Sequence, residues 1–212
     1  MITTFSDGPR LAGGPNRPEM TLLEPLEVPK TIVFVGLMGA GKSCIGRNLA
    51  KTLGLTFVDA DAEIEKAAGC TIEDIFELHG ETAFRDGERR VLARLLDGPA
   101  CVLGTGGGAF IDARTRARIR DEAISIWLRA DLDLLLERTA RRNNRPLLKT
   151  GDPRDILARL MAERHPIYAE ADIVVDSADG PPEVTLRRVV TALRGYLDNG
   201  RGGLDDGRGG AS

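Results

Sequence analysis

Short apolar runs alternate along the chain with longer segments in which apolar residues recur every three or four positions. The runs typical of buried strands lie at residues 32–35, 56–59, 100–103, 124–128 and 173–176. Helical spacing predicts helices over about 45–53, 61–68, 71–78, 81–96, 112–120, 132–142, 153–169 and from 182 onwards. Short strands separated by helices indicate a parallel sheet covered on both faces. We therefore predict an α/β fold with three layers.

Several predicted helices begin with residues that satisfy the free N–H groups of a first turn. Thr71 and Asp74 have the spacing of a capping box, and Asp112 precedes another helical segment. Asp152 is followed by Pro153, which is a favoured first residue of a helix. These signals define where three of the helices start.

The two ends of the chain lack the periodicity of the middle. Residues 1–29 are rich in glycine, proline and charge, with a weak apolar patch at residues 20–26, and we expect a flexible extension. Residues 199–212 are glycine-rich and of low complexity, which predicts a disordered tail. The predicted folded domain is therefore residues 30–198.

Composition excludes several classes of partner. The chain has 212 residues with a formal charge of −3, so bulk electrostatic binding of nucleic acid is not expected. We find neither an apolar run that approaches the roughly 18 residues of a membrane span nor a signal-peptide pattern. Cys44, Cys70 and Cys101 fit no metal or redox spacing and suggest a reducing compartment, with a cytoplasmic location as the default.

The most specific motif follows the first predicted strand. Residues 36–43 read GLMGAGKS, a full match to the phosphate-binding loop G-x-x-x-x-G-K-[ST], and a helical pattern follows. Backbone N–H groups of such a loop surround phosphate oxygens, assisted by the positive end of the helix dipole. Lys42 would reach the β- and γ-phosphates, and Ser43 would be a ligand of Mg²⁺. The motif predicts a site for a nucleoside triphosphate.

Acidic groups follow the second predicted strand at Asp59 and Asp61. The third strand ends at Leu103 and Gly104 without an aspartate, so we expect Asp59 to organise the metal. Asp61 either caps the next helix or faces a second ligand. Because ligands of open parallel sheets bind beyond the carboxyl ends of the strands, these acids should lie near the phosphate loop.

Arginines form the other candidate groups. Arg85 has Glu88 three residues later, and by itself this spacing favours a solvated ion pair over a fork for a carboxylate or phosphate. Arg138 begins a cluster, completed by residues 141, 142 and 145, that suits either a helix end or a mobile lid. Arg164 is a further basic site. The two histidines, residues 79 and 165, are assigned to the surface or to packing.

A second glycine cluster allows another interpretation. Residues 104–109 formally match the dinucleotide fingerprint G-x-G-x-x-A, and Asp131 follows the next strand. The phosphate loop on the first strand is far more specific. We therefore expect these glycines to let a ligand approach the backbone closely.

Taken together, the motifs make residues 30–197 resemble the shikimate kinase family. The residues that carry the resemblance are GLMGAGKS (36–43), IGRNLA (45–50), DAD (59–61), IEDIF (72–76), GE-x-x-FR (80–85), GGGA (106–109), RPLL (145–148) and R-x-P-x-Y (164–168). The resemblance implies the P-loop kinase fold, with a five-stranded parallel sheet, a mobile lid at about residues 140–152 and a helical substrate-binding region. It also implies phosphorylation of the 3-hydroxyl of shikimate, with ATP and Mg²⁺ as cofactors, in the route to chorismate and aromatic amino acids. We expect a monomer with no nucleic-acid or membrane partner.

Matching positions transfer roles to this chain. Asp61 would orient the shikimate hydroxyls, Arg85 and Arg164 would hold the carboxylate, and Gly107 and Gly108 would contact substrate through the backbone. The walls of the substrate pocket would be Phe76 and Phe84. The nucleotide-binding residues would be Gly39, Ala40, Gly41, Lys42, Ser43, Cys44, Arg138 and Arg145.

In this scheme Lys42, Asp61 and Arg145 are the catalytic residues. Arg138 flanks the adenine, Arg145 approaches the phosphates from the lid, and Asp59 holds Mg²⁺ through water.

Two departures and two alternatives accompany the resemblance. Cys44 stands where the family often has threonine, and Gly104-Thr105 precede the glycine cluster where a larger apolar residue is commoner, which leaves local strand packing open. A related sugar-acid kinase such as a gluconate kinase is the alternative enzyme. A catalytically silent nucleotide-binding module is the alternative of another class, and the joint presence of Asp61, Arg85 and Arg164 argues against it.

Overall fold

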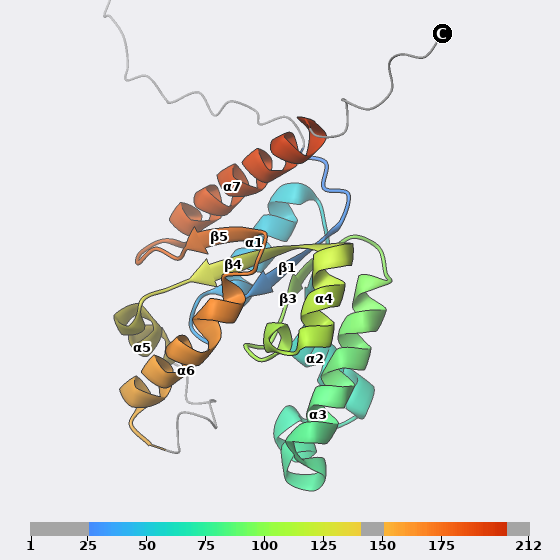
Figure 1. The fold of residues 1–212 in the computed structure, drawn as a ribbon, viewed down its shortest axis with the longest axis vertical. Coiled ribbons are helices and arrows are strands. Elements are labelled where there is room, and N and C mark those ends of the chain that lie inside the picture. Colours follow the sequence, from blue (N-terminus) through green and yellow to red (C-terminus); the bar gives the residue numbers. More distant parts are fainter. Residues whose placement is uncertain (1–25, 141–150, 203–212) are drawn as a thin grey trace, which may run out of the picture.

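A five-stranded parallel sheet forms the centre of the protein (Figure 1). The computed structural model describes residues 26–140 and 151–202. The strands are β1 (Thr31–Val35), β2 (Phe57–Asp59), β3 (Val102–Gly104), β4 (Ala123–Arg129) and β5 (Ile173–Asp176). Their order across the sheet is β2-β3-β1-β4-β5. The sheet predicted from the apolar runs is confirmed, and each strand lies within two residues of its predicted bounds.

Helices cover both faces of this sheet. They are α1 (Lys42–Leu53), α2 (Ala60–Ala68), α3 (Ile72–Leu96), α4 (Ala113–Glu122), α5 (Leu132–Ala140), α6 (Pro153–Tyr168) and α7 (Pro182–Gly202), with a short 3₁₀ helix, η1, at Ala109–Ile111. α1 and α7 pack against each other on one face, whereas α3, α4 and α6 gather around η1 on the other (Figure 1). The predicted three-layer architecture is therefore present.

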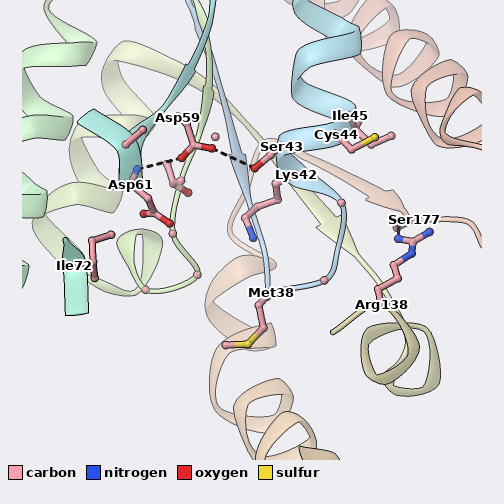
Figure 2. A pocket seen from close by; sticks show the side chains of 18 of the residues that line it. Met38, Lys42, Ser43, Cys44, Ile45, Asp59, Asp61, Ile72, Arg138 and Ser177 are labelled. Atoms are coloured by element: carbon pink, nitrogen blue, oxygen red, sulfur yellow. Dashed lines mark hydrogen bonds between the residues drawn. The ribbon is translucent and has the colours of Figure 1, made fainter. Parts of the chain in front are cut away.

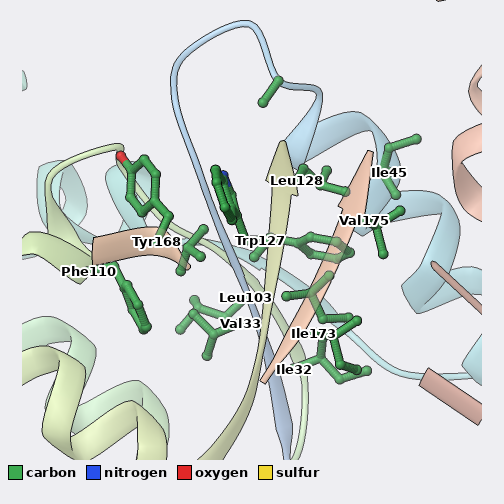
Figure 3. Packing of buried hydrophobic residues seen from close by; sticks show 14 of the residues in the cluster. Ile32, Val33, Ile45, Leu103, Phe110, Trp127, Leu128, Tyr168, Ile173 and Val175 are labelled. Carbon is green, nitrogen blue, oxygen red and sulfur yellow. The ribbon is translucent and has the colours of Figure 1, made fainter. Parts of the chain in front are cut away.

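The burial of the strands matches their order across the sheet. Every residue of β1, the central strand, is buried, as expected for a strand covered on both faces. At the edge, β5 alternates, with Ile173 and Val175 buried and Val174 and Asp176 exposed. Figure 3 shows side chains from β1, β3, β4 and β5 packed into one cluster.

The predicted helix starts are confirmed in detail. Thr71 and Asp74 form a reciprocal capping box at the start of α3. Asp112 and Asp152 each accept a backbone N–H bond at the start of α4 and α6. The two helices predicted at 71–78 and 81–96 form one element, α3, with non-helical backbone at Gly80 (φ 77°, ψ 174°). The sequence pattern did not predict η1.

The ends of the described chain differ slightly from the predicted boundaries. Leu26 and Val28, within the predicted extension, pack against the core. α7 runs to Gly202, past the predicted boundary at 198, because adding a residue to an existing helix is far easier than starting one. The remainder of the extension, the lid segment and the end of the tail lie outside the described residues. Within 26–140 and 151–202, no helix has the length and apolar character that crossing a membrane requires.

Candidate active site

A cleft of about 870 Å³ lies beyond the carboxyl ends of β1, β2 and β3 (Figure 2). Its walls come from the phosphate loop, the start of α2, α3, the glycine loop after β3, α5, α6 and the β5–α7 connection. The predicted site residues that line it are Gly39, Gly41, Lys42, Ser43, Cys44, Asp59, Asp61, Phe76, Phe84, Arg85, Gly107, Gly108, Arg138 and Arg164. Ala40 is buried and does not line the cleft. Arg145 lies outside the described residues.

The phosphate loop turns tightly between β1 and α1. Gly36 has φ 130°, and a Cβ on it would stand 2.7 Å from the Leu128 carbonyl oxygen, so only glycine fits there. Lys42 Nζ donates to the carbonyl oxygens of Gly36 at 2.7 Å and Leu37 at 2.9 Å. The lysine thus spans its own loop and holds its charge inside the cleft.

Asp59 connects the phosphate loop to the start of α2. Ser43 Oγ donates to Asp59 Oδ2 at 3.4 Å, while Asp59 Oδ1 accepts from the Asp61 N–H at 3.2 Å (Figure 2). Asp59 is therefore the N-cap of α2, and the alternative that Asp61 caps this helix is wrong. The carboxylate of Asp61 instead lines the cleft.

Three successive glycines after β3 support functional side chains from three different elements. Measured from where a Cβ would stand, Asp61 Oδ1 is 3.0 Å from Gly106 and Arg164 Nη1 is 3.5 Å from Gly107. The third glycine, Gly108, would place its Cβ 2.7 Å from Nη2 and 2.8 Å from Cζ of Arg85. This loop, residues 106–108, therefore brings Asp61, Arg85 and Arg164 into one cleft.

Arg85 is held by two acids of α3. Its Nη1 donates to Glu88 at 2.7 Å, and its Nη2 and Nε donate to Glu81 at 3.1 and 3.3 Å. Burial raises the pKa of Glu88, against the opposing effect of the Arg85 hydrogen bond and charge. Burial lowers the pKa of Arg85, but the two carboxylates outweigh it and the net direction is upward. The Glu88 side chain is only 4% exposed, so the solvated-pair interpretation of Arg85 and Glu88 is wrong.

Arg164 shares an acceptor with Tyr168, the tyrosine of the R-x-P-x-Y motif, to which the sequence analysis gave no role. Arg164 Nη1 donates to the Gly107 carbonyl at 3.2 Å, and the Tyr168 hydroxyl donates to the same oxygen. Burial raises the pKa of Tyr168, which keeps this donor protonated. Tyr168 lies one helical turn after Arg164 on α6, a spacing that would have identified it as a neighbour. His165 packs edge-on against Trp127, in line with its assignment to packing.

Arg138 closes the opposite end of the cleft. Its Nη1 donates to Ser177 Oγ at 2.9 Å and its Nη2 to the Ala178 carbonyl at 2.7 Å, so it ties α5 to the β5–α7 connection (Figure 2). A Cβ on Gly41 would stand 3.7 Å from Arg138 Nη1, which places the guanidinium beside the phosphate loop. Sequence reasoning missed Ser177 because its neighbour Arg138 is 39 residues away along the chain.

Comparison with known proteins gives a consistent result. The family profile described as shikimate kinase matches residues 38–194. A shikimate kinase of Paramagnetospirillum magneticum is 61% identical over 183 residues, covering 85% of this chain and 94% of the relative. One from Caulobacter vibrioides is 56% identical over 172 residues, covering 81% of this chain and 86% of the relative. The chain belongs to the shikimate kinase family.

Solved structures agree with this assignment. A shikimate kinase from Acinetobacter baumannii, solved in complex with shikimate, superposes with a TM-score of 0.74 at 40% identity, covering 80% of this chain and 94% of that one. A gluconokinase from Sinorhizobium meliloti has a TM-score of 0.55 at 20% identity and shares the fold alone, with 81% of this chain and 95% of that chain covered. The protein is therefore a kinase with the P-loop kinase fold, and its phosphoryl donor is ATP.

Proposed function

We propose that the protein transfers the γ-phosphoryl group of ATP to the 3-hydroxyl of shikimate, with Mg²⁺, in the route to chorismate and aromatic amino acids. The observation that carries the proposal is the shared cleft: Asp61, Arg85 and Arg164 line the same space as the phosphate loop. A silent nucleotide-binding module would have no use for two arginines and an acid arranged beside the triphosphate.

The substrate end of the cleft suits a small hydroxylated carboxylate. Arg85 and Arg164 lie over neighbouring glycines and offer two guanidinium groups to one carboxylate. Asp61, over the first glycine of the same loop, would align the reacting hydroxyl and accept its proton. Phe76 and Phe84, whose ring centroids are 4.7 Å apart, would form the apolar wall.

The nucleotide end suits a triphosphate. Lys42 would move from the carbonyl oxygens of its own loop to the β- and γ-phosphates. Arg138, fixed by two hydrogen bonds, would lie against the base. The predicted role of Arg145, in the lid, falls outside the described residues and stays a prediction.

The residues between the two ends fit a Mg²⁺ ion. Ser43 and Asp59 offer a hydroxyl and a carboxylate, the hard oxygen donors that Mg²⁺ prefers, and this ion commonly takes its other ligands from water and phosphates. No group of three or more His, Cys, Asp or Glu that could hold a metal occurs among residues 26–140 and 151–202, which suits such a shared site. The ion would neutralise charge on the transferring phosphate.

Two further parts of the proposal concern the cell and the assembly. We propose a cytoplasmic monomer. The three cysteines, Cys44, Cys70 and Cys101, are all free, which supports a reducing compartment.

An assay of ADP release tests the function directly. With ATP and Mg²⁺ present, we expect turnover with shikimate and none above background with gluconate or nucleoside monophosphates. Turnover with gluconate alone would favour the alternative sugar-acid kinase. Absence of turnover with every acceptor would favour the silent module.

The catalytic role of Lys42 is tested in the same assay. Lys42→Ala should lower turnover with shikimate by roughly 10³-fold or more, because a charge that stabilises the transferring phosphate is lost. Lys51→Ala, on the exposed last turn of the same helix, is the matched control. Turnover of Lys42→Ala within about ten-fold of the control would contradict the role.

A further inference from the structure

The guanidinium group of Arg85 already has carboxylate partners on two sides within the cleft. Glu88 accepts from Nη1, and Glu81 accepts from both Nη2 and Nε, so each of the three guanidinium nitrogens has a carboxylate partner. An arginine that must bind the carboxylate of a substrate is therefore engaged by protein acids when the cleft holds no substrate.

The local charge makes this arrangement unfavourable for an incoming anion. One guanidinium faces two carboxylates, so Arg85 and its partners carry a net charge of −1. Asp61 lies close by, since a Cβ on Gly106 would stand 3.0 Å from Asp61 Oδ1 and 3.4 Å from Glu88 Oε1. A third carboxylate arriving at Arg85 would meet repulsion from these acids, and its attraction to Arg85 would be largely offset. The guanidinium still has two unused N–H groups, so the obstacle is this repulsion, and withdrawal of one of the two acids would relieve it.

The two acids differ in their ability to withdraw. The Glu88 side chain is only 4% exposed and borders the cleft close to Asp61, so it has little freedom to turn away from Arg85. The Glu81 side chain is 68% exposed and can turn into solvent at small cost. Glu81 also directly follows Gly80, where the backbone of α3 is non-helical and a Cβ would meet nothing within 4 Å. Glu81 is the partner that can leave.

We propose that Glu81 is a placeholder carboxylate: it binds Arg85 in the empty site and gives way to the carboxylate of the acceptor substrate. Glu88 keeps the guanidinium in position during the exchange. Glu81 is thus a positioning residue that lowers affinity for the acceptor, and this inference rests on the proposed function. The simpler alternative is an i,i+4 pair that only supports the helix. The two hypotheses predict different effects of removing Glu81 on substrate affinity, because loss of a competitor strengthens substrate binding and loss of a helix support does not.

The test compares Glu81→Gln with Glu77→Gln. Glu77 lies on α3 before the non-helical Gly80, is exposed and makes no ion pair with a described residue, so its substitution changes the same charge away from Arg85. Shikimate affinity is measured by calorimetry without nucleotide, and the KM values for shikimate and ATP are measured by ADP release. We expect Glu81→Gln to bind shikimate about two- to five-fold more tightly than Glu77→Gln, as loss of an exposed competing pair predicts, with the KM for ATP unchanged. Glu81→Ala should show the same gain.

The outcomes separate the two hypotheses. If wild type turns over shikimate but Glu81→Gln and Glu81→Ala bind it no more tightly than the control, the placeholder role is overturned. Weaker binding by both variants would also overturn it, because Glu81 would then only orient Arg85. If wild type neither binds nor phosphorylates shikimate, the proposed function fails, and the placeholder role fails with it.

Discussion

Substitution of Gly108 by alanine tests the close contact between this glycine and the guanidinium group of Arg85. The backbone at Gly108 has φ −96° and ψ −19°, which alanine adopts without strain. The new Cβ would overlap Nη1, the nearest atom of Arg85, and would stand 2.7 Å from Nη2, whereas an ordinary contact begins at 3.4 Å, so the guanidinium must retreat by more than 0.7 Å. The tip of a long side chain can make this movement, so the fold should survive.

The functional cost follows from that displacement. A guanidinium that has moved loses its alignment with the substrate carboxylate and strains its 2.7 Å bond to Glu88. A hydrogen bond to a charged group contributes about 1.5–3 kcal/mol, equivalent to about 10- to 150-fold in affinity. We therefore expect Gly108→Ala to raise the KM for shikimate by about 10- to 150-fold while the KM for ATP changes little.

The assay is ADP release at varied shikimate and varied ATP, with urea unfolding as the check on the fold. Gly87→Ala is the matched control, because Gly87 lies on α3 two residues from Arg85 and a Cβ there would meet nothing within 4 Å. A KM for shikimate within about three-fold of this control would refute the steric reasoning. A double-mutant cycle sharpens the result: on an Arg85→Ala background, Gly108→Ala should add almost nothing. Additive effects would show that the alanine acts through something other than Arg85.

Two further predictions concern stability. Gly46→Ala should lower the free energy of unfolding, measured in urea, by about 1–3 kcal/mol despite the better helix propensity of alanine, because its Cβ would stand 2.6 Å from the Phe57 ring. Phe57→Leu should relieve this loss. An unchanged or stabilised Gly46→Ala would contradict this packing. Because burial raises the pKa of Glu88 above 4.5, its stabilising contribution is complete below that pH and is lost as pH rises through the folded pKa. The stability of Glu88→Gln relative to wild type should therefore increase with pH above about 4.5 in urea melts at several pH values, and a difference that stays flat or falls would contradict the buried carboxylate.

Features set by neighbouring residues were predictable from the sequence. The phosphate loop, the helix caps and the five strands depend on contacts within a few positions, and local motifs and hydrophobic periodicity record them directly. The sheet edge on which Asp59 and Asp61 lie followed from the rule that ligands bind beyond parallel strand ends. These parts of the site needed no coordinates.

Features set by long-range packing were not predictable. The i,i+3 spacing of Arg85 and Glu88 does not say which face of α3 turns inward, so the spacing alone wrongly favoured a solvated pair, and only the family resemblance pointed Arg85 to the substrate. Tyr168 was recognised as part of a motif but given no role, because the carbonyl that it binds is 61 residues away. The open question about Gly104 is resolved by the Phe57 ring, whose Cζ lies 3.1 Å from where a Cβ of Gly104 would stand. A larger residue there would collide with that ring.

The position of Trp127 has a practical consequence. It is the single tryptophan of the chain, its ring lies against the first glycine of the phosphate loop, and its indole N–H is buried without a hydrogen-bond partner among the described residues. A lone buried indole is a natural fluorophore whose emission responds to water and to nearby charge. Any rearrangement of the loop around ATP will therefore alter its spectrum, so nucleotide titrations and stopped-flow experiments can be carried out on the unlabelled protein.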